Sequence, residues 1–340
     1  MDSLYGMSPA ELAVACSLEP AFRTRQVAKW LARGTASFEQ MTDLARSERE
    51  RLSALFPRIA SSEPKAEFQD PDGSLKLQIR LGDGSAVECV LLRDIEGRKT
   101  ACLSSQVGCP MGCTFCKTGS LGYLRDLSAG EILEQYHFLR ARVGRVPNVV
   151  FMGMGEPCDN LGAVRKAIGI LADAVGLSLR KITISTSGLV PGILDLADHG
   201  PAVRLAVSLT CANEELRSRL MPINRRWGLA ALKEALLRYQ AATGERVTLE
   251  CAIMGGVNSS EESARELVAW IGSLEAQVNL IPWNRVPGLP FVEPTREELD
   301  AYLEVLRAAR LVAVRRMRRG RGIMGACGQL GDTLQAEDPS

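Results

Sequence analysis

The pattern of apolar and polar residues divides this sequence into regions that favour different secondary structure. Residues 1–60 have apolar side chains at helical intervals, as in the stretch that contains Phe22, Val27 and Leu31. A further helix is expected to begin near Phe38, because the serine and threonine just before it can cap its amino end. This region is therefore predicted to be a small helical module.

Between residues 66 and 92 the apolar positions change to a period of two. They alternate with polar residues on both sides of the pair Asp83-Gly84, which is a common turn signal, so a β-hairpin is expected. Glu88 is out of phase with the apolar positions of its strand and is predicted to face away from the core of the hairpin. The alternating apolar residues are Leu75, Leu77, Ile79, Leu81, Val87, Cys89 and Leu91.

Beyond residue 100, short apolar runs alternate with longer helical stretches. The apolar runs are Ala101–Leu103, Val149–Met152, Ile182–Ile184, Val203–Val207, Val247–Leu249 and Val278–Ile281, with Leu311–Val314 as a last candidate. The helical stretches include Ser128–Arg142, Leu161–Val175, Leu229–Ala242 and Ser260–Leu274. Six strands joined by long crossovers predict an α/β fold with a parallel sheet, either open or curled into a partial barrel. Ligands of such folds bind at the carboxyl ends of the strands.

The composition is that of a soluble globular protein, with 46% apolar and 24% charged residues. Ten cysteines in 340 residues do not fit a secreted disulfide scaffold. Neither an amino-terminal signal nor an apolar run long enough to cross a bilayer is evident. We therefore expect a cytoplasmic protein without membrane contact.

The net charge is +1, so affinity for nucleic acid would have to come from local basic patches. Residues 315–321 contain five arginines in seven positions, which suits binding to phosphates. Four basic residues also lie within residues 23–33 of the first amphipathic segment. For each segment, a plain solvated charged surface is the alternative.

Three cysteines within eight positions give the clearest chemical signal. Cys109, Cys113 and Cys116 have the spacing C-x-x-x-C-x-x-C. Three thiolates from one short loop can hold three corners of a cubic iron–sulfur cluster and leave the fourth iron open to a small molecule. A tetrahedral zinc site would need a fourth ligand nearby, and the two histidines, His137 and His199, are distant in sequence. Three ordinary buried thiols are the alternative.

Polar residues directly follow several of the predicted strands. The second strand ends in a turn with Gly155 and Glu156, where the backbone can approach a ligand and the carboxylate can accept hydrogen bonds from an amino group. The third strand ends at Ser187, the fourth at Ser208-Leu209-Thr210 and the sixth at Asn284. Each one alone is explained by a local turn or cap, whereas all four at one edge predict a binding site.

Two further cysteines are set apart by their positions. Cys102 lies on the first strand, seven residues before the cysteine motif, and Cys327 lies in a segment of small residues near the carboxyl end. The small neighbours leave the Cys327 thiol accessible, which a core cysteine does not need. From chemistry alone either thiol can be inert. We assign this inert role to Cys16, Cys89, Cys158, Cys211 and Cys251.

These motifs together resemble the RlmN/Cfr family of radical-SAM RNA methyltransferases, where SAM is S-adenosylmethionine. The resemblance extends from Phe22-Arg23 to Gly328-Gln329-Leu330 and is most specific at Ser104–Cys109, Phe151–Pro157, Leu220–Asn224 and Ala326–Leu330. It implies a partial (β/α)6-type radical-SAM barrel, a [4Fe-4S] cluster on Cys109, Cys113 and Cys116, and two SAM molecules per turnover. It also implies an adenine substrate in 23S ribosomal RNA, with transfer RNA as a further substrate, an electron donor such as flavodoxin, and a monomeric protein.

The family also implies roles for individual residues. The cysteine that corresponds to Cys327 carries a methyl group from one SAM, and a radical formed from a second SAM activates this group for addition to carbon 2 of adenine or, alternatively, carbon 8. Glu88 would be the base that removes the ring proton, and Cys102 would release the product through a disulfide with Cys327. The residues implied in SAM binding are Gly155, Glu156, Ser187, Ser208, Leu209, Thr210 and Asn284.

The sequence departs from the family in two places. Thr210 stands where the family has a histidine, and the spacing between Glu88 and Cys102 is one residue longer. The expected organisation is a helical module in residues 1–62, a β-hairpin extension in 63–94, the radical-SAM core in 95–322 and a tail with the reactive cysteine in 323–340.

Two rival functions follow from the same motifs. Another radical-SAM enzyme, acting on a protein or a small molecule, would not need Cys102 and Cys327. A non-catalytic iron–sulfur RNA-binding protein would bind a cluster or RNA without cleaving SAM.

Overall fold

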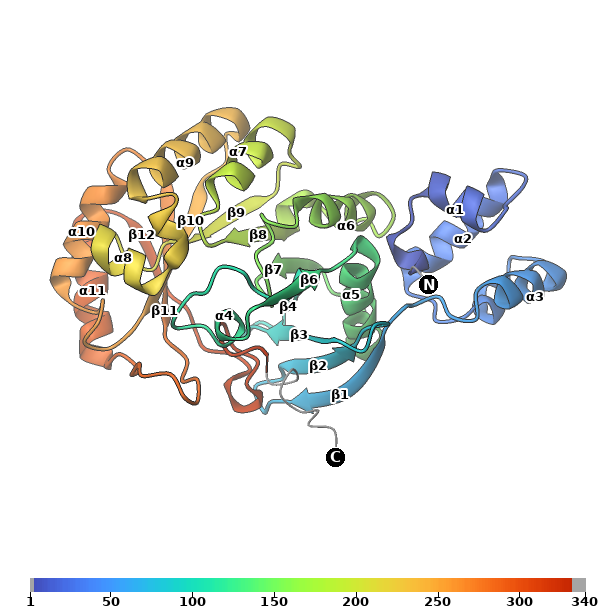
Figure 1. Ribbon diagram of the computed structural model, residues 1–340, viewed down its shortest axis with the longest axis horizontal. Helices are drawn as coiled ribbons and strands as arrows, with labels where there is room; N and C mark the ends of the chain where they lie inside the picture. The colour runs from blue at the N-terminus through green and yellow to red at the C-terminus, as the bar shows by residue number, and fades with distance from the viewer. Residues whose placement is uncertain (1–2, 332–340) are drawn as a thin grey trace.

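One sheet of ten strands connects most parts of the chain, of which the computed structural model describes residues 3–331. Seven of its strands form a curved parallel sheet with helices on the outer side (Figure 1). In spatial order they are β4 (Lys99–Cys102), β7 (Asn148–Phe151), β8 (Ile182–Thr186), β9 (Arg204–Ser208), β10 (Val247–Ile253), β11 (Ala276–Pro282) and β12 (Val312–Arg315). Each pairs in parallel with the next. The expected α/β fold with a parallel sheet is confirmed, as is the last strand candidate.

The connections between these strands are helices that pack on the sheet. They are α5 (Ala129–Val143), α6 (Leu161–Asp173), α7 (Val190–His199), α8 (Glu214–Leu220), α9 (Leu229–Thr243), α10 (Glu261–Ile271) and α11 (Arg296–Ala308). Ser128 and Glu131 form a reciprocal capping box at the start of α5, and Thr295 and Glu298 do the same for α11. Within residues 3–331, no helix is long and apolar enough to cross a membrane.

Smaller elements complete the described fold. They are the antiparallel pair β5 (Gln106–Gly108) and β6 (Tyr123–Asp126), the short helix α4 (Lys117–Ser120), and the 3-10 helices η3 (Leu179–Lys181), η4 (Pro222–Arg225) and η5 (Arg321–Ile323). The loop with the three clustered cysteines lies between β5 and α4.

The predicted hairpin is present and forms part of a longer antiparallel ribbon. Its strands β2 (Leu75–Arg80) and β3 (Ala86–Arg93) enclose the expected Asp83-Gly84 turn, and β3 also pairs with β4. An additional edge strand, β1 (Glu63–Gln69), pairs with β2. The apolar pattern did not indicate β1, because this strand is largely exposed and rich in charged residues.

The amino-terminal helices form a module at one side of the barrel (Figure 1). They are α1 (Pro9–Ala15), α2 (Phe22–Arg33) and α3 (Arg46–Leu55), with the 3-10 turns η1 (Leu4–Gly6) and η2 (Phe38–Gln40). The expectation of a helix near Phe38 is wrong, because the chain makes only one 3-10 turn there and the helix begins at Arg46. Tyr5 attaches the module to α5 by stacking on His137, with ring centroids 4.4 Å apart.

Candidate active site

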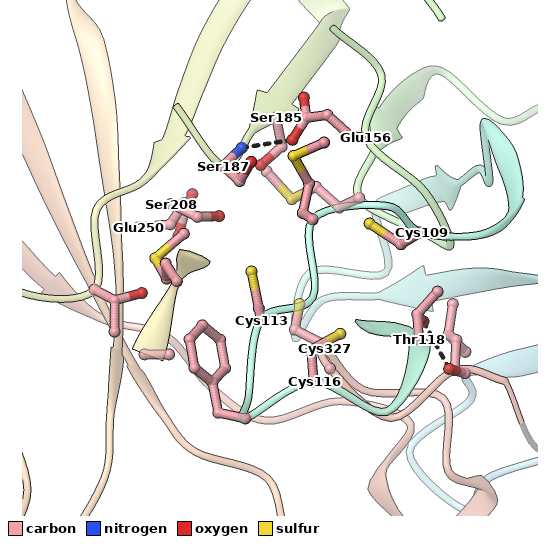
Figure 2. A pocket seen from close by; sticks show the side chains of 18 of the residues that line it. Cys109, Cys113, Cys116, Thr118, Glu156, Ser185, Ser187, Ser208, Glu250 and Cys327 are labelled. Atoms are coloured by element: carbon pink, nitrogen blue, oxygen red, sulfur yellow. Dashed lines mark hydrogen bonds between the residues drawn. The ribbon is translucent and has the colours of Figure 1, made fainter. Parts of the chain in front are cut away.

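A cavity opens at the carboxyl ends of the parallel strands, where most of the predicted ligand-binding residues meet (Figure 2). The cysteine loop forms one wall, and the ends of β7, β8, β9, β10 and β11 form the other. The sequence-predicted residues that line it are Cys109, Cys113, Cys116, Gly155, Glu156, Ser187, Ser208, Thr210, Asn284 and Cys327. Glu88, Cys102 and Leu209 are not among the lining residues.

The cysteine loop is held in shape by backbone hydrogen bonds. Cys109 donates its N–H to the carbonyl of Gly122 at 2.7 Å, and Thr114 donates to the carbonyl of Leu220 at 2.9 Å. A glycine is required at Gly108, because its φ is +76° and a Cβ there would lie 2.0 Å from the Gly122 carbonyl oxygen. The position of the thiols is therefore set by the surrounding fold.

The chemistry of the three thiols fits an iron–sulfur cluster. Burial raises the pKa of each one, to about 12 for Cys109, and the neighbouring thiols raise that of Cys113 further. The positive charge of iron would hold them as thiolates. Within residues 3–331, no three such side chains converge closely enough to hold a single metal ion. In a cubic cluster each thiolate binds a different iron, so the three thiols need not converge on one point.

The glycine-rich turn after β7 brings a buried carboxylate to the cavity wall. Glu156 is 3% exposed, and its carboxylate accepts hydrogen bonds from the backbone N–H groups of Ser187 at 2.7 Å and Cys158 at 3.1 Å. Burial raises the pKa of Glu156, and these bonds oppose the shift. The turn needs glycine at Gly155, where φ is +99° and a Cβ would lie 2.6 Å from that of Gln106.

Three buried polar atoms around the cavity have no hydrogen-bond partner among the described residues. They are Ser187 Oγ, Thr210 Oγ1 and Asn284 Oδ1. Buried polar atoms are nearly always paired in folded proteins, so these atoms indicate a polar ligand. Thr210 also has a φ of +65°, a region that β-branched residues rarely adopt. Leu209 lies behind the wall, with its N–H bonded to the carbonyl of Glu250 at 3.0 Å.

Cys327 lies between this cavity and a second one and lines both. The second cavity also contains Cys102 and the arginine-rich segment that precedes Cys327. Cys327 is an exposed residue, yet burial of its thiol among the surrounding protein atoms raises the pKa of that thiol to about 11, and Glu250 adds to the shift. Burial likewise raises the pKa of Cys102, with a further contribution from Cys327. Both cysteines line the second cavity.

Glu88 is fully buried and lines neither cavity. Its Oε1 accepts hydrogen bonds from Lys76 Nζ and Gln78 Nε2, both at 3.1 Å, and its Oε2 accepts one from the N–H of Gly331 at 2.8 Å. As predicted, Glu88 points away from the apolar face of the hairpin. The side to which it points is also covered by protein, so its carboxylate does not reach solvent. The pairing of Val90 with Cys102 places Glu88 and Cys102 on the same face of the sheet.

The structure adds Glu250 to the site, which the sequence analysis did not identify. This glutamate is 7% exposed, lines both cavities, and accepts a hydrogen bond from Asn279 Nδ2 at 2.9 Å. Burial raises its pKa. The only available signal was an acidic residue within an apolar strand, which is rare unless the carboxylate has a partner.

Acidic residues neutralise part of the arginine-rich segment. Glu293 pairs with Arg318 at 2.7 Å and also with Arg321. Asp300 lies 3.8 Å from Arg315. Among residues 3–331, no carboxylate pairs with Arg93, Arg316 or Arg319, which line the second cavity. Arg98, Arg315 and Arg318 line this cavity too, but each lies within 4 Å of a carboxylate, so the unpaired arginines of the cavity among the described residues are these three.

Comparison with known proteins gives an independent view of the chain. Residues 103–268 match the radical SAM superfamily, and residues 4–57 match the N-terminal domain of ribosomal RNA large subunit methyltransferases. The chain is 49% identical over 333 residues to a probable dual-specificity RNA methyltransferase RlmN of Treponema pallidum, covering 97% of this chain and 98% of the relative. It is 42% identical to the dual-specificity RNA methyltransferase RlmN of Anaeromyxobacter dehalogenans, covering 94% and 89%.

A solved structure agrees over the same length. The crystal structure of a radical SAM methyltransferase from Sphaerobacter thermophilus is 41% identical and superimposes with a TM-score of 0.92, covering 97% of this chain and 99% of that chain.

Proposed function

Because this chain belongs to the RlmN/Cfr family of radical-SAM RNA methyltransferases, we propose that it methylates a ring carbon of adenine in 23S ribosomal RNA, with carbon 2 favoured over carbon 8. The similar proteins are named dual-specificity RNA methyltransferases, which supports transfer RNA as a further substrate.

We assign the cofactors to the residues that line the first cavity. Cys109, Cys113 and Cys116 would hold a [4Fe-4S] cluster, and the unpartnered atoms of Ser187, Thr210 and Asn284 would bind SAM. When bound, the cluster and two SAM molecules per turnover would supply a methyl group and a 5′-deoxyadenosyl radical that activates it. The backbone around Gly155 and the carboxylate of Glu156 would complete this binding site. A one-electron donor such as flavodoxin belongs to the proposal, because reductive cleavage of SAM consumes an electron.

The observation that carries the proposal is the place of Cys327 between two cavities. From there its sulfur can accept a methyl group on one side and present it to a base on the other. Cys102 lines the second cavity together with Cys327. Its thiolate can attack the Cys327 sulfur and form a disulfide, while the bond between that sulfur and the transferred carbon breaks and the carbon takes up a proton to become the methyl group of the released base. A binding protein or a generic radical-SAM enzyme has no use for this pair.

The second cavity suits a base that is turned out of an RNA structure. Its rim carries Arg93, Arg316 and Arg319, which can contact the adjoining phosphates, and its wall carries the two thiols. A flipped adenine in this cavity would meet the sulfur of Cys327 directly.

We retain Glu88 as the proposed proton acceptor, with a condition set by its contacts. Both carboxylate oxygens are engaged, and the partner of Oε2 is Gly331, four residues beyond Cys327. Glu88 would therefore act on the substrate after this end of the Cys327 segment moves. The proposed role of Glu88 as a base therefore depends on the position of the segment that contains Cys327 and Gly331.

The decisive experiment is anaerobic turnover of the reconstituted protein with SAM and ribosomal RNA, comparing the wild type with Cys102→Ala. We expect the variant to accumulate a protein–RNA crosslink through Cys327, which a denaturing gel and mass spectrometry detect. The trapped nucleotide then identifies both the base and the carbon. Cys89→Ala is the matched control, because Cys89 is a fully buried thiol on β3 that lines neither cavity.

Two outcomes contradict the proposal. Cleavage of SAM without any modification of RNA would assign the protein to another radical-SAM reaction. Multiple turnover by the Cys102→Ala protein would remove the disulfide step from the mechanism.

A further inference from the structure

The Leu220–Asn224 segment was among the most specific stretches of the sequence, yet no residue of it has a role in the proposed chemistry. This segment begins with Leu220, which is the last residue of α8. The helix contributes Arg217, which is 0% exposed and is among the largest fully buried side chains of the described protein. Burying a charged guanidinium costs free energy unless its N–H groups are hydrogen-bonded. A fully buried arginine is therefore expected to have a role in folding or function.

Arg217 connects the ends of two strands that form the cavity wall. Its Nη2 donates to the carbonyl of Ser187 after β8 at 2.8 Å and reaches that of Ser208 on β9 at 3.4 Å. Its Nε donates to the carbonyl of Leu209 at 3.0 Å. Ser187 carries one of the hydroxyl groups that lack partners, and Leu209 directly precedes Thr210, which carries the other. Arg217 therefore fixes the backbone on which those hydroxyls are mounted.

The other end of the guanidinium is bound to the Leu220–Asn224 segment itself. Arg217 Nη1 donates to Asn224 Oδ1 at 2.6 Å. Asn224 Nδ2 in turn donates to Glu214 Oε1 at 2.7 Å and to Ser218 Oγ at 2.8 Å. The helix and the segment that follows it are thereby joined into one unit around Arg217.

The same unit holds the cysteine loop. The carbonyl of Leu220, at the end of α8, accepts the hydrogen bond from the N–H of Thr114, which lies between Cys113 and Cys116. A Cβ at Gly112 would lie 3.8 Å from Pro222. The residues on both sides of the cavity, the loop and the strand ends, are thus positioned by one short stretch of chain.

Arginine suits this position for a geometric reason. The planar guanidinium offers donors in several fixed directions, and here they reach acceptors on three separate segments. Among residues 3–331, no carboxylate forms an ion pair with it, so backbone carbonyls and an amide oxygen alone satisfy its donors. A lysine would keep the charge but could not hold all three segments at once.

From this geometry we infer that Arg217 is a positioning residue that sets the strand ends of the SAM site relative to the cluster loop. A SAM molecule held by both walls would depend on their relative position for its affinity. The inference rests on the proposed function for the identity of the ligand.

The test compares Arg217→Lys and Asn224→Ala with the wild type after anaerobic reconstitution. We expect SAM affinity, measured by isothermal titration calorimetry, to fall at least tenfold in Arg217→Lys and by less in Asn224→Ala. Iron content and the electron paramagnetic resonance spectrum of the reduced cluster without SAM should stay at wild-type values. The spectral change on adding SAM should be lost at a concentration that saturates the wild type.

Arg219→Lys is the matched control on the same helix, because Arg219 is exposed and its one ion pair within residues 3–331 is with Glu215, at 3.7 Å. It should bind SAM as the wild type does. A purely structural role for Arg217 would instead lower iron content and SAM binding together.

The outcomes separate this inference from the proposed function. Wild-type SAM affinity in Arg217→Lys overturns the inference, and if that variant does not fold, wild-type affinity in Asn224→Ala overturns it. Failure of the wild-type protein itself to bind SAM would instead refute the proposed function.

Discussion

The ion pair between Lys76 and Glu88 offers a direct test of how the segment with Cys327 is held. The two side chains are 4% and 0% exposed, and the distance between Nζ and Oε1 is 3.1 Å. Lys76 Nζ also reaches the carbonyl of Met324 at 3.4 Å, and Glu88 binds the N–H of Gly331. The pair therefore joins strands β2 and β3 to both sides of Cys327. The perturbation we choose is Lys76→Met, which keeps an unbranched side chain that is one atom shorter and removes the charge.

The expected loss of stability follows from leaving the Glu88 carboxylate without its cation. Removing one partner of a buried ion pair costs about 3–5 kcal/mol, because the remaining charge stays buried. Glu88 keeps its hydrogen bonds from Gln78 and Gly331, which reduces this cost. We therefore expect the free energy of unfolding to fall by about 3 kcal/mol, the lower end of that range.

The assay is urea unfolding followed by tryptophan fluorescence. Three of the four tryptophans, Trp227, Trp270 and Trp283, lie in the barrel, so the signal reports on the body that contains the pair. The midpoint should shift to lower urea with an unchanged slope. A double variant, Lys76→Met with Glu88→Leu, removes both charges and should be more stable than Lys76→Met alone. A loss below about 1 kcal/mol, or a double variant that is less stable than Lys76→Met, would refute the reasoning.

Three further predictions concern single side chains. Burial, with Arg140 nearby, lowers the pKa of His137 to about 3, so as pH falls through about 6.5 the imidazole takes up a proton in the unfolded chain but not in the folded protein. This uptake should remove about 2 kcal/mol of stability between pH 7 and pH 5, and the His137→Phe variant should not show that loss. Equal losses in the wild type and the variant in urea titrations would contradict this. Gly155→Ala should destabilise the protein by about 1–3 kcal/mol and abolish SAM binding in calorimetry, because its Cβ would overlap Gln106, whereas the control Gly162→Ala has open space and should do neither. Thr210→Val should weaken SAM binding about tenfold without lowering stability, because it removes a hydroxyl that has no protein partner; a stability loss above about 1 kcal/mol would show that the hydroxyl is bonded within the fold.

Much of the fold could be predicted from the sequence, because the signals are local. Six apolar runs separated by helical stretches indicated the parallel sheet, and the period of two with its Asp83-Gly84 turn indicated the hairpin. Strand β1 was missed because it lacks a sequence signal, and the start of α3 was missed because a misleading signal precedes Phe38. β1 is an exposed edge strand without apolar alternation, whereas the serine and threonine before Phe38 form a turn that resembles a helix cap.

Some parts of the candidate site could likewise be predicted from local sequence patterns, whereas others could not. The spacing of Cys109, Cys113 and Cys116 and the polar tips of the strands are short-range patterns, and the strand order brings them to one edge. Glu250 was missed because a single glutamate within an apolar strand carries no motif, although it lines both cavities. Leu209 was included because it is adjacent to Ser208 and Thr210, but alternation along the chain turns it to the other side of the wall.

The sequence by itself determined the main parts of this protein: a three-cysteine loop after the first strand of a parallel α/β barrel, and a cysteine among small residues near the carboxyl end. Only the tertiary structure decided what that thiol faces. Cys327 lines two cavities, and Glu88 is bound by Gly331, a residue 243 positions away. Such contacts depend on distances between segments that are far apart in the sequence. No local pattern encodes them, because packing of the whole barrel fixes them at once.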